Sequence, residues 1–268
     1  KGRDKINMKY KNRYFQFIRG ILIYFVIFIH CIYENNNAYA NICNIIIRNI
    51  INLGVPIFIF MAGYFTNKEK VLNNPKYYML KRIKRLLIPL VIYSALYSFF
   101  SVIGNESSGT LYIYDFLKKF LTFSSAPQLY YIVVLLQITI LTPLILKFIK
   151  NSKIKKILYL ITPIYLLVQG ILKIIFKIDI PHYQFYFFGW IIYYLIGLEL
   201  SSNKHLSLKR SYIVLIITLA IEIVVNLIIY NLNNEVYSYV TSQLNIMNLL
   251  CVLAVIPLII CANENYKT

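Results

Sequence analysis

Acidic side chains are scarce in this sequence. Its 268 residues include 10 Asp and Glu against 28 Lys and Arg, which gives a formal net charge of +18 at pH 7. Only 14% of the residues are charged and 59% are hydrophobic, whereas soluble proteins have about 25% charged residues. Several long runs hold almost no charge. This composition excludes an ordinary soluble domain.

Cysteine is also sparse, and its placement argues against a metal centre. The four cysteines are Cys31, Cys43, Cys251 and Cys261. None forms a C-x-x-C pair or lies at a zinc-ligand spacing from histidine, so we expect buried hydrophobic side chains and no bound metal. No linker rich in Pro, Gly or Ser divides the chain. We therefore expect one domain over residues 1–268.

The apolar runs predict an all-α fold, a polytopic helical membrane bundle. Only helices and closed barrels satisfy the backbone in lipid, and the runs lack the alternation of barrel strands. A spanning helix needs about 20 apolar residues. Eight segments meet this criterion: 15–33, 43–65, 84–103, 129–149, 157–176, 183–200, 211–231 and 245–262. The segment 111–123 is too short and too charged, so we expect an amphipathic helix at the interface.

Strongly basic loops alternate along the chain with loops that hold few Lys or Arg residues. The basic clusters in the loops include Lys68, Lys70 and Lys76, then Lys150, Lys153, Lys155 and Lys156, then Lys204, Lys209 and Arg210. By contrast, the loop after the seventh segment holds Glu235 and no Lys or Arg. Because cytoplasmic loops collect positive charge, both termini are predicted to be cytoplasmic. The net charge thus reflects membrane topology, and we expect no nucleic-acid partner.

The first segment contains "IRGILIYFVIFIHC", with Arg19 near its front and His30 near its end. Eleven residues of helix place the two side chains within roughly 20° of one face and about 16 Å apart along the axis. Glu34 follows four residues later, on the same face of a continued helix. One interpretation is polar residues at helix ends, with Arg19 reaching the cytoplasmic interface. The other is a functional site, because intramembrane ionisable residues often mark one.

Two further features allow both a structural and a functional interpretation. Gly54, Pro56 and Gly63 interrupt the second segment, which indicates either close helix packing or a kink beside a cavity. The third segment begins near Lys81, Arg82 and Arg85. These cations either anchor the helix at the cytoplasmic side or bind phosphate groups.

Polar residues also lie inside other apolar segments. Glu222 with Asn226 occupies the seventh segment, and Gln137 occupies the fourth. Such side chains should face the bundle interior. Arg48 in the second segment needs a partner. The sequence leaves open whether Glu222 is protonated, paired with Arg48 or lining a cavity.

Taken together, these motifs resemble the acyltransferase-3 family, integral membrane O-acetyltransferases of cell-envelope glycans. The matching residues are Arg19 and Gly20 with His30; Gly54, Val55, Phe58, Phe60 and Gly63; Lys81, Arg82, Arg85 and Pro89; and Pro143. Ala62 stands where the family commonly has Ser, Lys81 where it has Arg, and Tyr130 where it has Trp. The family usually has ten core helices, so the resemblance implies that the last pair is missing here and that the domain is truncated at its C-terminus.

The resemblance implies an enzyme of the bacterial plasma membrane. Its donor would be cytoplasmic acetyl-CoA and its acceptor a hydroxyl of a glycan or lipid-linked sugar. His30 would act as general base, with Glu34 orienting its ring. Arg19, Arg82, Arg85 and Lys81 would form a basic mouth for the phosphates of CoA.

Three other functions remain open. A flippase for a lipid-linked saccharide would suit Glu222 and the interrupted second segment, but it would not consume acetyl-CoA, and no inverted repeat is seen. A glycan polymerase or ligase would need His or Arg in an outer loop, and the longest, 104–128, has neither. A purely structural membrane module is the third.

Overall fold

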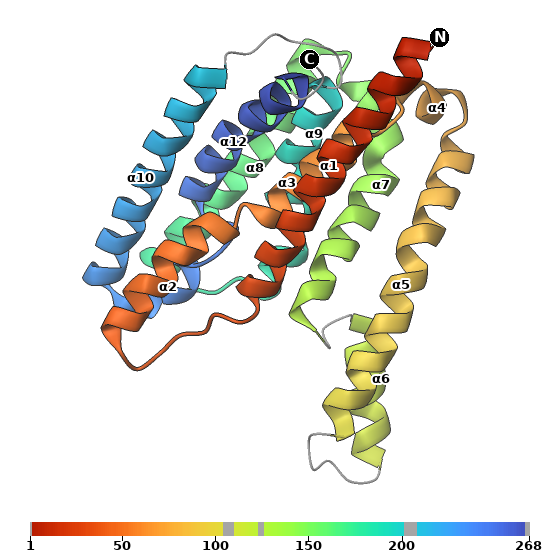
Figure 1. Cartoon of the computed structure of the whole chain (residues 1–268). Helices are drawn as coiled ribbons and strands as arrows, with labels where there is room; N and C mark the ends of the chain where they lie inside the picture. Colours follow the sequence, from red (N-terminus) through yellow and green to blue (C-terminus); the bar gives the residue numbers. More distant parts are fainter. Residues whose placement is uncertain (1, 104–109, 123–125, 201–207, 266–268) are drawn as a thin grey trace. The chain divides into compact units, whose positions relative to one another are not determined.

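A computed structural model describes residues 2–103, 110–122, 126–200 and 208–265. The elements in these ranges are α-helices and short 3-10 helices, with no strand among them (Figure 1). The chain forms two compact units. One contains residues 1–66, 159–180 and 192–268, and the other contains 67–158 and 181–191. Lys204 and residues 104–109 of the predicted outer loop lie outside the described residues.

Six helical segments within the described ranges are long and apolar enough to cross a membrane. They are Ala38–Tyr64, Pro75–Ser101, Ile113–Phe148, Ser152–Ile174, Leu208–Leu232 and Ile246–Asn263. The predicted all-helical membrane protein is thereby confirmed. The sequence predicted eight spans, and the two that are not among these six are 15–33 and 183–200.

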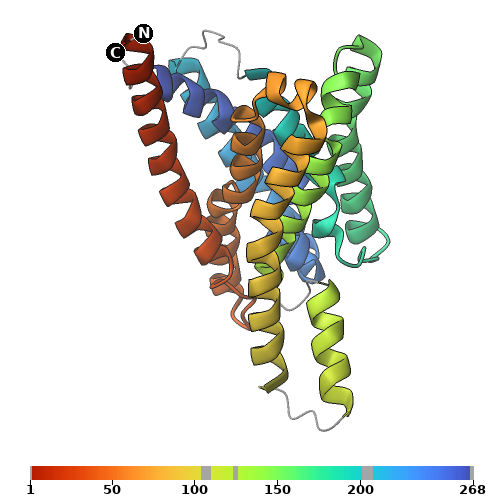
Figure 2. The same ribbon diagram turned by 90° about the vertical axis from the view of Figure 1, so that its right-hand side faces the viewer.

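The first unit is built from helices of both halves of the chain. Its elements are α1 (Gly2–Ile29), α2 (Ala38–Ile51), α3 (Gly54–Tyr64), most of α8 (Ser152–Ile174), α9 (Ile191–Leu200), α10 (Leu208–Leu232), α11 (Tyr237–Val240) and α12 (Ile246–Asn265). Helix α10 packs along α12 and against α2, and α1 packs against α2 and α3 (Figures 1 and 2).

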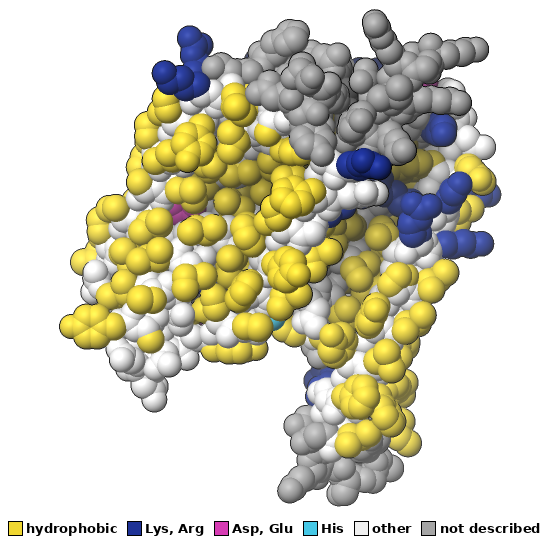
Figure 3. All heavy atoms as spheres, in the orientation of Figure 1, with side chains coloured by type: hydrophobic (Ala, Val, Ile, Leu, Met, Phe, Trp, Pro, Cys, Tyr) yellow, Lys and Arg dark blue, Asp and Glu magenta, His cyan; other side chains and the backbone are white. Residues whose placement is uncertain are grey.

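The outward face of α10 is apolar over most of its length (Figure 3). Its large exposed side chains include Tyr212, Ile213, Val214, Ile216, Ile217, Ile221, Val224 and Ile228. Lys209 and Arg210 stand at its N-terminal end. An apolar outer face that ends in cations is the pattern of a lipid-facing helix with its base at a membrane surface.

The predicted interruption of the second segment is confirmed. Helix α2 ends at Ile51 and α3 begins at Gly54. Asn52, in the break, donates from Nδ2 to the Thr241 carbonyl at 3.0 Å. The break therefore serves as an attachment point between distant parts of the first unit.

Helices α3 and α9 approach each other backbone to backbone. A Cβ on Gly63 would lie 2.2 Å from the Tyr194 carbonyl oxygen, and one on Gly197 would lie 2.2 Å from that of Phe60. Only glycine permits so close an approach. At Gly63, close packing is thus the observed role.

The prediction of a spanning helix over 183–200 is wrong. Residues Tyr183–Phe185 and Phe187–Gly189 form 3-10 helices, and α9 has only 10 residues, about 15 Å of helix. The reason is Gln137 of α7 (Tyr130–Phe148), which donates from Nε2 to the Phe185 carbonyl (2.9 Å) and accepts from the Phe187 N–H (3.0 Å). These bonds satisfy an irregular backbone that apolar composition alone assigns to a helix.

The second unit packs α5 against α6 and α7. Its elements are α4 (Lys68–Asn73), α5 (Pro75–Ile103), α6 (Thr110–Thr122), a 3-10 helix at Pro127–Leu129, α7 (Tyr130–Phe148) and the two 3-10 helices at 183–189. The short helix predicted at 111–123 is present as α6. Ser94 of α5 donates to the Phe120 carbonyl at 3.0 Å, and Lys119 donates to Ser101 at 2.7 Å.

Candidate functional site

Helix α1 carries Arg19, and His30 follows directly after its last residue. The helix ends at Ile29, so His30 is the first residue of the turn beyond it, where its N–H donates to the Ile27 carbonyl at 3.0 Å. The expectation that Glu34 lies one helical turn beyond His30 is wrong, because the helix does not continue. Glu34 is exposed, and among the described contacts no hydrogen bond joins it to His30.

Side chains of α2 hold the turn that contains His30. The bonds are Arg48 Nη2 to the Ile32 carbonyl (2.8 Å), Asn44 Nδ2 to the Tyr33 carbonyl (2.9 Å) and Asn41 Nδ2 to the Asn35 carbonyl (2.7 Å). Positions 41, 44 and 48 share one helical face. This face of α2 therefore fixes the backbone path immediately after His30.

His30 is half-buried at this turn. Burial lowers the pKa of its imidazole below the ordinary 6.5, and the positive charge of Arg48 acts in the same direction. The ring is therefore mainly neutral at physiological pH, the form that can accept a proton.

Arg19 is exposed near the other end of the apolar stretch of α1. Its Cζ lies 5.2 Å from the ring centroid of Phe65, the residue that follows α3. This cation–π contact orients the guanidinium and leaves its surface open to an anion. Arg19 and His30 thus lie at opposite ends of one helix segment.

The basic residues of the third predicted segment belong to the second unit, on the early turns of α5. Arg82 is half-buried, donates from Nη1 to the Tyr78 hydroxyl, and has its Cζ 5.8 Å from that ring's centroid. Lys81 Nζ lies 5.7 Å from the Tyr77 ring centroid. Arg85 is exposed. Tyrosines therefore position two of the three cations.

The interior of the first unit holds a polar group that the sequence only partly located. Glu222 is 1% exposed and hydrogen-bonds the Cys251 thiol. Arg48 instead donates to the Ile32 carbonyl. One turn along α10, Asn226 donates to Asn49 of α2 (2.9 Å) and accepts from Asn245 (2.7 Å).

Sequence reasoning missed Asn41, Asn44 and Asn49. Asparagine is so frequent in this chain that its composition alone carries no signal. The spacing of Asn41, Asn44 and Arg48 along one helix face is the feature that identifies the first two.

Known proteins place this geometry in context. A family model described as an acyltransferase domain matches residues 12–268. The chain is also similar to proteins of Staphylococcus aureus strains MSSA476 and MRSA252, each called "Probable poly-beta-1,6-N-acetyl-D-glucosamine export protein". The identities are 29% and 28% over 227 residues, 76% of this chain and 61% of each relative. The matched part thus spans about three fifths of the relatives' length. No solved structure matches the chain.

Proposed function

Because this chain belongs to the acyltransferase-3 family of membrane proteins, we propose that it transfers an acetyl group from cytoplasmic acetyl-CoA to a hydroxyl of a surface polysaccharide or lipid-linked sugar. The observation that carries the proposal is a half-buried histidine and an exposed arginine at opposite ends of one apolar helix segment. The site is in the bacterial plasma membrane, with the Arg19 end of α1 facing the cytoplasm.

His30 is the proposed general base. Its neutral imidazole takes the proton of the acceptor hydroxyl while the hydroxyl oxygen attacks the thioester carbonyl. The carbon–sulfur bond then breaks, and the imidazolium returns the proton to the departing CoA thiolate. The products are an ester and free CoA. Glu34 is retained only as a candidate to assist this proton transfer, from the segment that follows the turn.

The cations are the proposed binding groups for CoA. Arginine suits phosphate because its planar guanidinium donates two parallel hydrogen bonds. Arg82 and Arg85 with Lys81 supply this chemistry in one unit, and Arg19 supplies it in the other. Aromatic contacts at Arg19, Arg82 and Lys81 limit the side-chain motion that binding must suppress.

A reconstituted assay tests the proposal. The purified chain in lipid nanodiscs is given acetyl-labelled acetyl-CoA and short β-1,6-linked N-acetylglucosamine oligomers, and labelled ester is measured. We expect His30→Ala to lower the rate at least 100-fold, the typical contribution of a general base. His182→Ala, a histidine in the second unit, is the matched control and should keep the rate. Full activity in His30→Ala contradicts the role of His30.

The same assay tests the CoA site. Arg82→Gln and Arg85→Gln should raise the KM for acetyl-CoA with a smaller effect on kcat, because they remove binding groups and leave the base intact. An unchanged KM in the double variant contradicts the assignment.

The names of the relatives favour one alternative, export of a poly-β-1,6-N-acetylglucosamine chain. Proteoliposomes loaded with the labelled oligomer separate the two functions. Export without acetyl-CoA, together with absence of ester formation, favours the transporter. Ester formation that requires acetyl-CoA favours the acyltransferase.

A further inference from the structure

Glu222 lies near the middle of an apolar helix. It follows Leu208, the first residue of α10, by 14 positions and precedes Leu232, the last, by 10, which is about 21 Å and about 15 Å of helix. Its exposed fraction is 1%. Such a position is costly for a carboxylate, and the proposed acyl transfer does not use it.

The groups around this carboxyl are neutral. The Cys251 thiol of α12 hydrogen-bonds it, and the Tyr193 hydroxyl of α9 faces it; both residues are 0% exposed. Its Oε2 atom has no hydrogen-bond partner. On the side of α2, the neighbour of Asn226 is the neutral amide of Asn49. Within the described ranges, no ion pair includes Glu222.

A buried carboxylate without a cation is far less stable than the buried neutral acid. We propose that Glu222 is an intramembrane proton-binding site, formed with Cys251 and Tyr193, that holds a proton at neutral pH. The proton converts Oε1 or Oε2 into a hydroxyl and removes the uncompensated charge. This site is separate from His30, and the proposal does not depend on acyl transfer.

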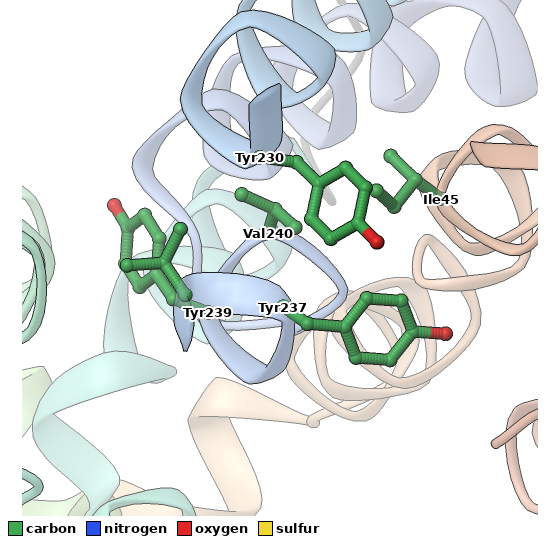
Figure 4. Close-up of a cluster of buried hydrophobic side chains, with 6 residues drawn as sticks. Ile45, Tyr230, Tyr237, Tyr239 and Val240 are labelled. Atoms are coloured by element: carbon green, nitrogen blue, oxygen red, sulfur yellow. The ribbon is translucent and has the colours of Figure 1, made fainter. Parts of the chain in front are cut away.

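A hydrogen bond joins Asn226 to a residue that lines a cavity. Asn226, one turn beyond Glu222, accepts from Asn245 Nδ2 at 2.7 Å. Asn245 lines a cavity of about 200 Å³ between α8, α10 and α11–α12, together with Gly170 and Tyr239. The Tyr239 ring points away from Tyr230 and Tyr237 (Figure 4), and its hydroxyl lies close to Gly170. Most residues that line this cavity are apolar, and Asn245 connects it by a hydrogen bond to Asn226.

Loss of the proton has a structural consequence. The new charge would lie between α10, α12 and α9, where the neighbouring polar groups among the described residues are the Cys251 thiol and the Tyr193 hydroxyl. Proton release should therefore loosen the packing of α10 against α12.

Labelling with dicyclohexylcarbodiimide, an apolar reagent that reacts with protonated carboxyls, tests the site. The chain in nanodiscs is labelled at a series of pH values and analysed by peptide mass spectrometry. We expect modification of the peptide containing Glu222 at neutral pH, decreasing as the pH is raised. Glu222→Gln should abolish it, and Glu235→Gln, which alters an exposed carboxylate paired with Lys177, should not. Labelling of Glu222 that does not decrease as the pH is raised overturns the proposal.

A stability measurement covers the case in which the reagent cannot enter. Glutamine mimics the neutral acid, so Glu222→Gln should keep the wild-type melting temperature at neutral pH and lose the wild-type decrease at alkaline pH. Glu222→Gln that is strongly destabilised at neutral pH, or that keeps the alkaline decrease, shows that Glu222 is ionised in the native state and overturns the proposal.

Discussion

At the scale of single residues, polar side chains in the apolar helices bond to backbone outside regular helix. Gln137 bonds to the 3-10 segment before α9, Asn52 to the end of α11, and Arg48 to the turn after His30. Backbone that leaves regular structure in lipid must find partners within the protein. These side chains provide them, and Glu222 stands apart because it bonds to no backbone group.

The environment of His30 predicts how the proposed transfer depends on pH. Because burial and then Arg48 lower the pKa of His30 in the folded protein, the imidazole becomes protonated only below its ordinary range. We expect kcat/KM to stay constant as the pH falls through 6.5 and to decline at lower pH. A pH profile of the nanodisc assay measures this.

Arg48 provides the control for that profile. Arg48→Gln removes the charge, so the acid limb should move toward higher pH, whereas Arg48→Lys keeps the charge and should leave the limb in place. An acid limb above 6.5 in the wild type, or one that does not respond to Arg48→Gln, contradicts the assignment of His30.

At the scale of elements, the contact between α3 and α9 makes a prediction about stability. A methyl group on Gly63 would lie 2.2 Å from the Tyr194 carbonyl, so Gly63→Ala must push the two backbones apart. We expect a loss of about 1–3 kcal/mol in the free energy of unfolding, the usual cost of overpacking. Denaturant unfolding in detergent measures it.

Gly20 is the matched control, because no neighbouring atom lies within 4 Å of a Cβ built there. In the interior of α1, Gly20→Ala should be neutral or stabilise by up to about 1 kcal/mol through helix propensity. Equal unfolding free energies for the two variants would contradict the packing argument.

These elements show which parts of the fold can be predicted from the sequence and why other parts cannot. The extents of α7 and α10 follow closely from the predictions 129–149 and 211–231, because a long apolar run has few other solutions in lipid. The short α9 depends on Gln137, some 50 positions away in sequence. The turn at His30 depends likewise on side chains of α2. The short α9 and the turn at His30 both depend on contacts between segments that are distant in sequence. Hydrophobic periodicity does not reveal such contacts.

At the scale of the whole molecule, charge patterning fits the two membrane surfaces. Two cations in loops that are predicted to face outward are paired with carboxylates. Lys173 lies 2.6 Å from Asp179, and Lys177 lies 2.7 Å from Glu235. Exposed pairs of this kind add little stability, but they reduce the net charge of loops that are predicted to face outward. The charge asymmetry from which the orientation is predicted is therefore larger than a count of cations indicates.

Cysteine labelling tests this orientation. The expectation of buried cysteines is wrong for Cys31 and Cys43, which are both exposed. In a Cys43→Ser background, a membrane-impermeant maleimide should label Cys31, in the turn after His30, in intact cells, and Cys31→Ser should remove that signal. Lys70, exposed between α3 and α5, belongs to a predicted cytoplasmic loop. In a background that carries both Cys31→Ser and Cys43→Ser, Lys70→Cys should react only after the membrane is permeabilised. If Lys70→Cys reacts in intact cells and Cys31 does not, the membrane orientation is reversed. His30 would then lie at the cytoplasmic surface, and an acceptor arriving from outside could not be its substrate.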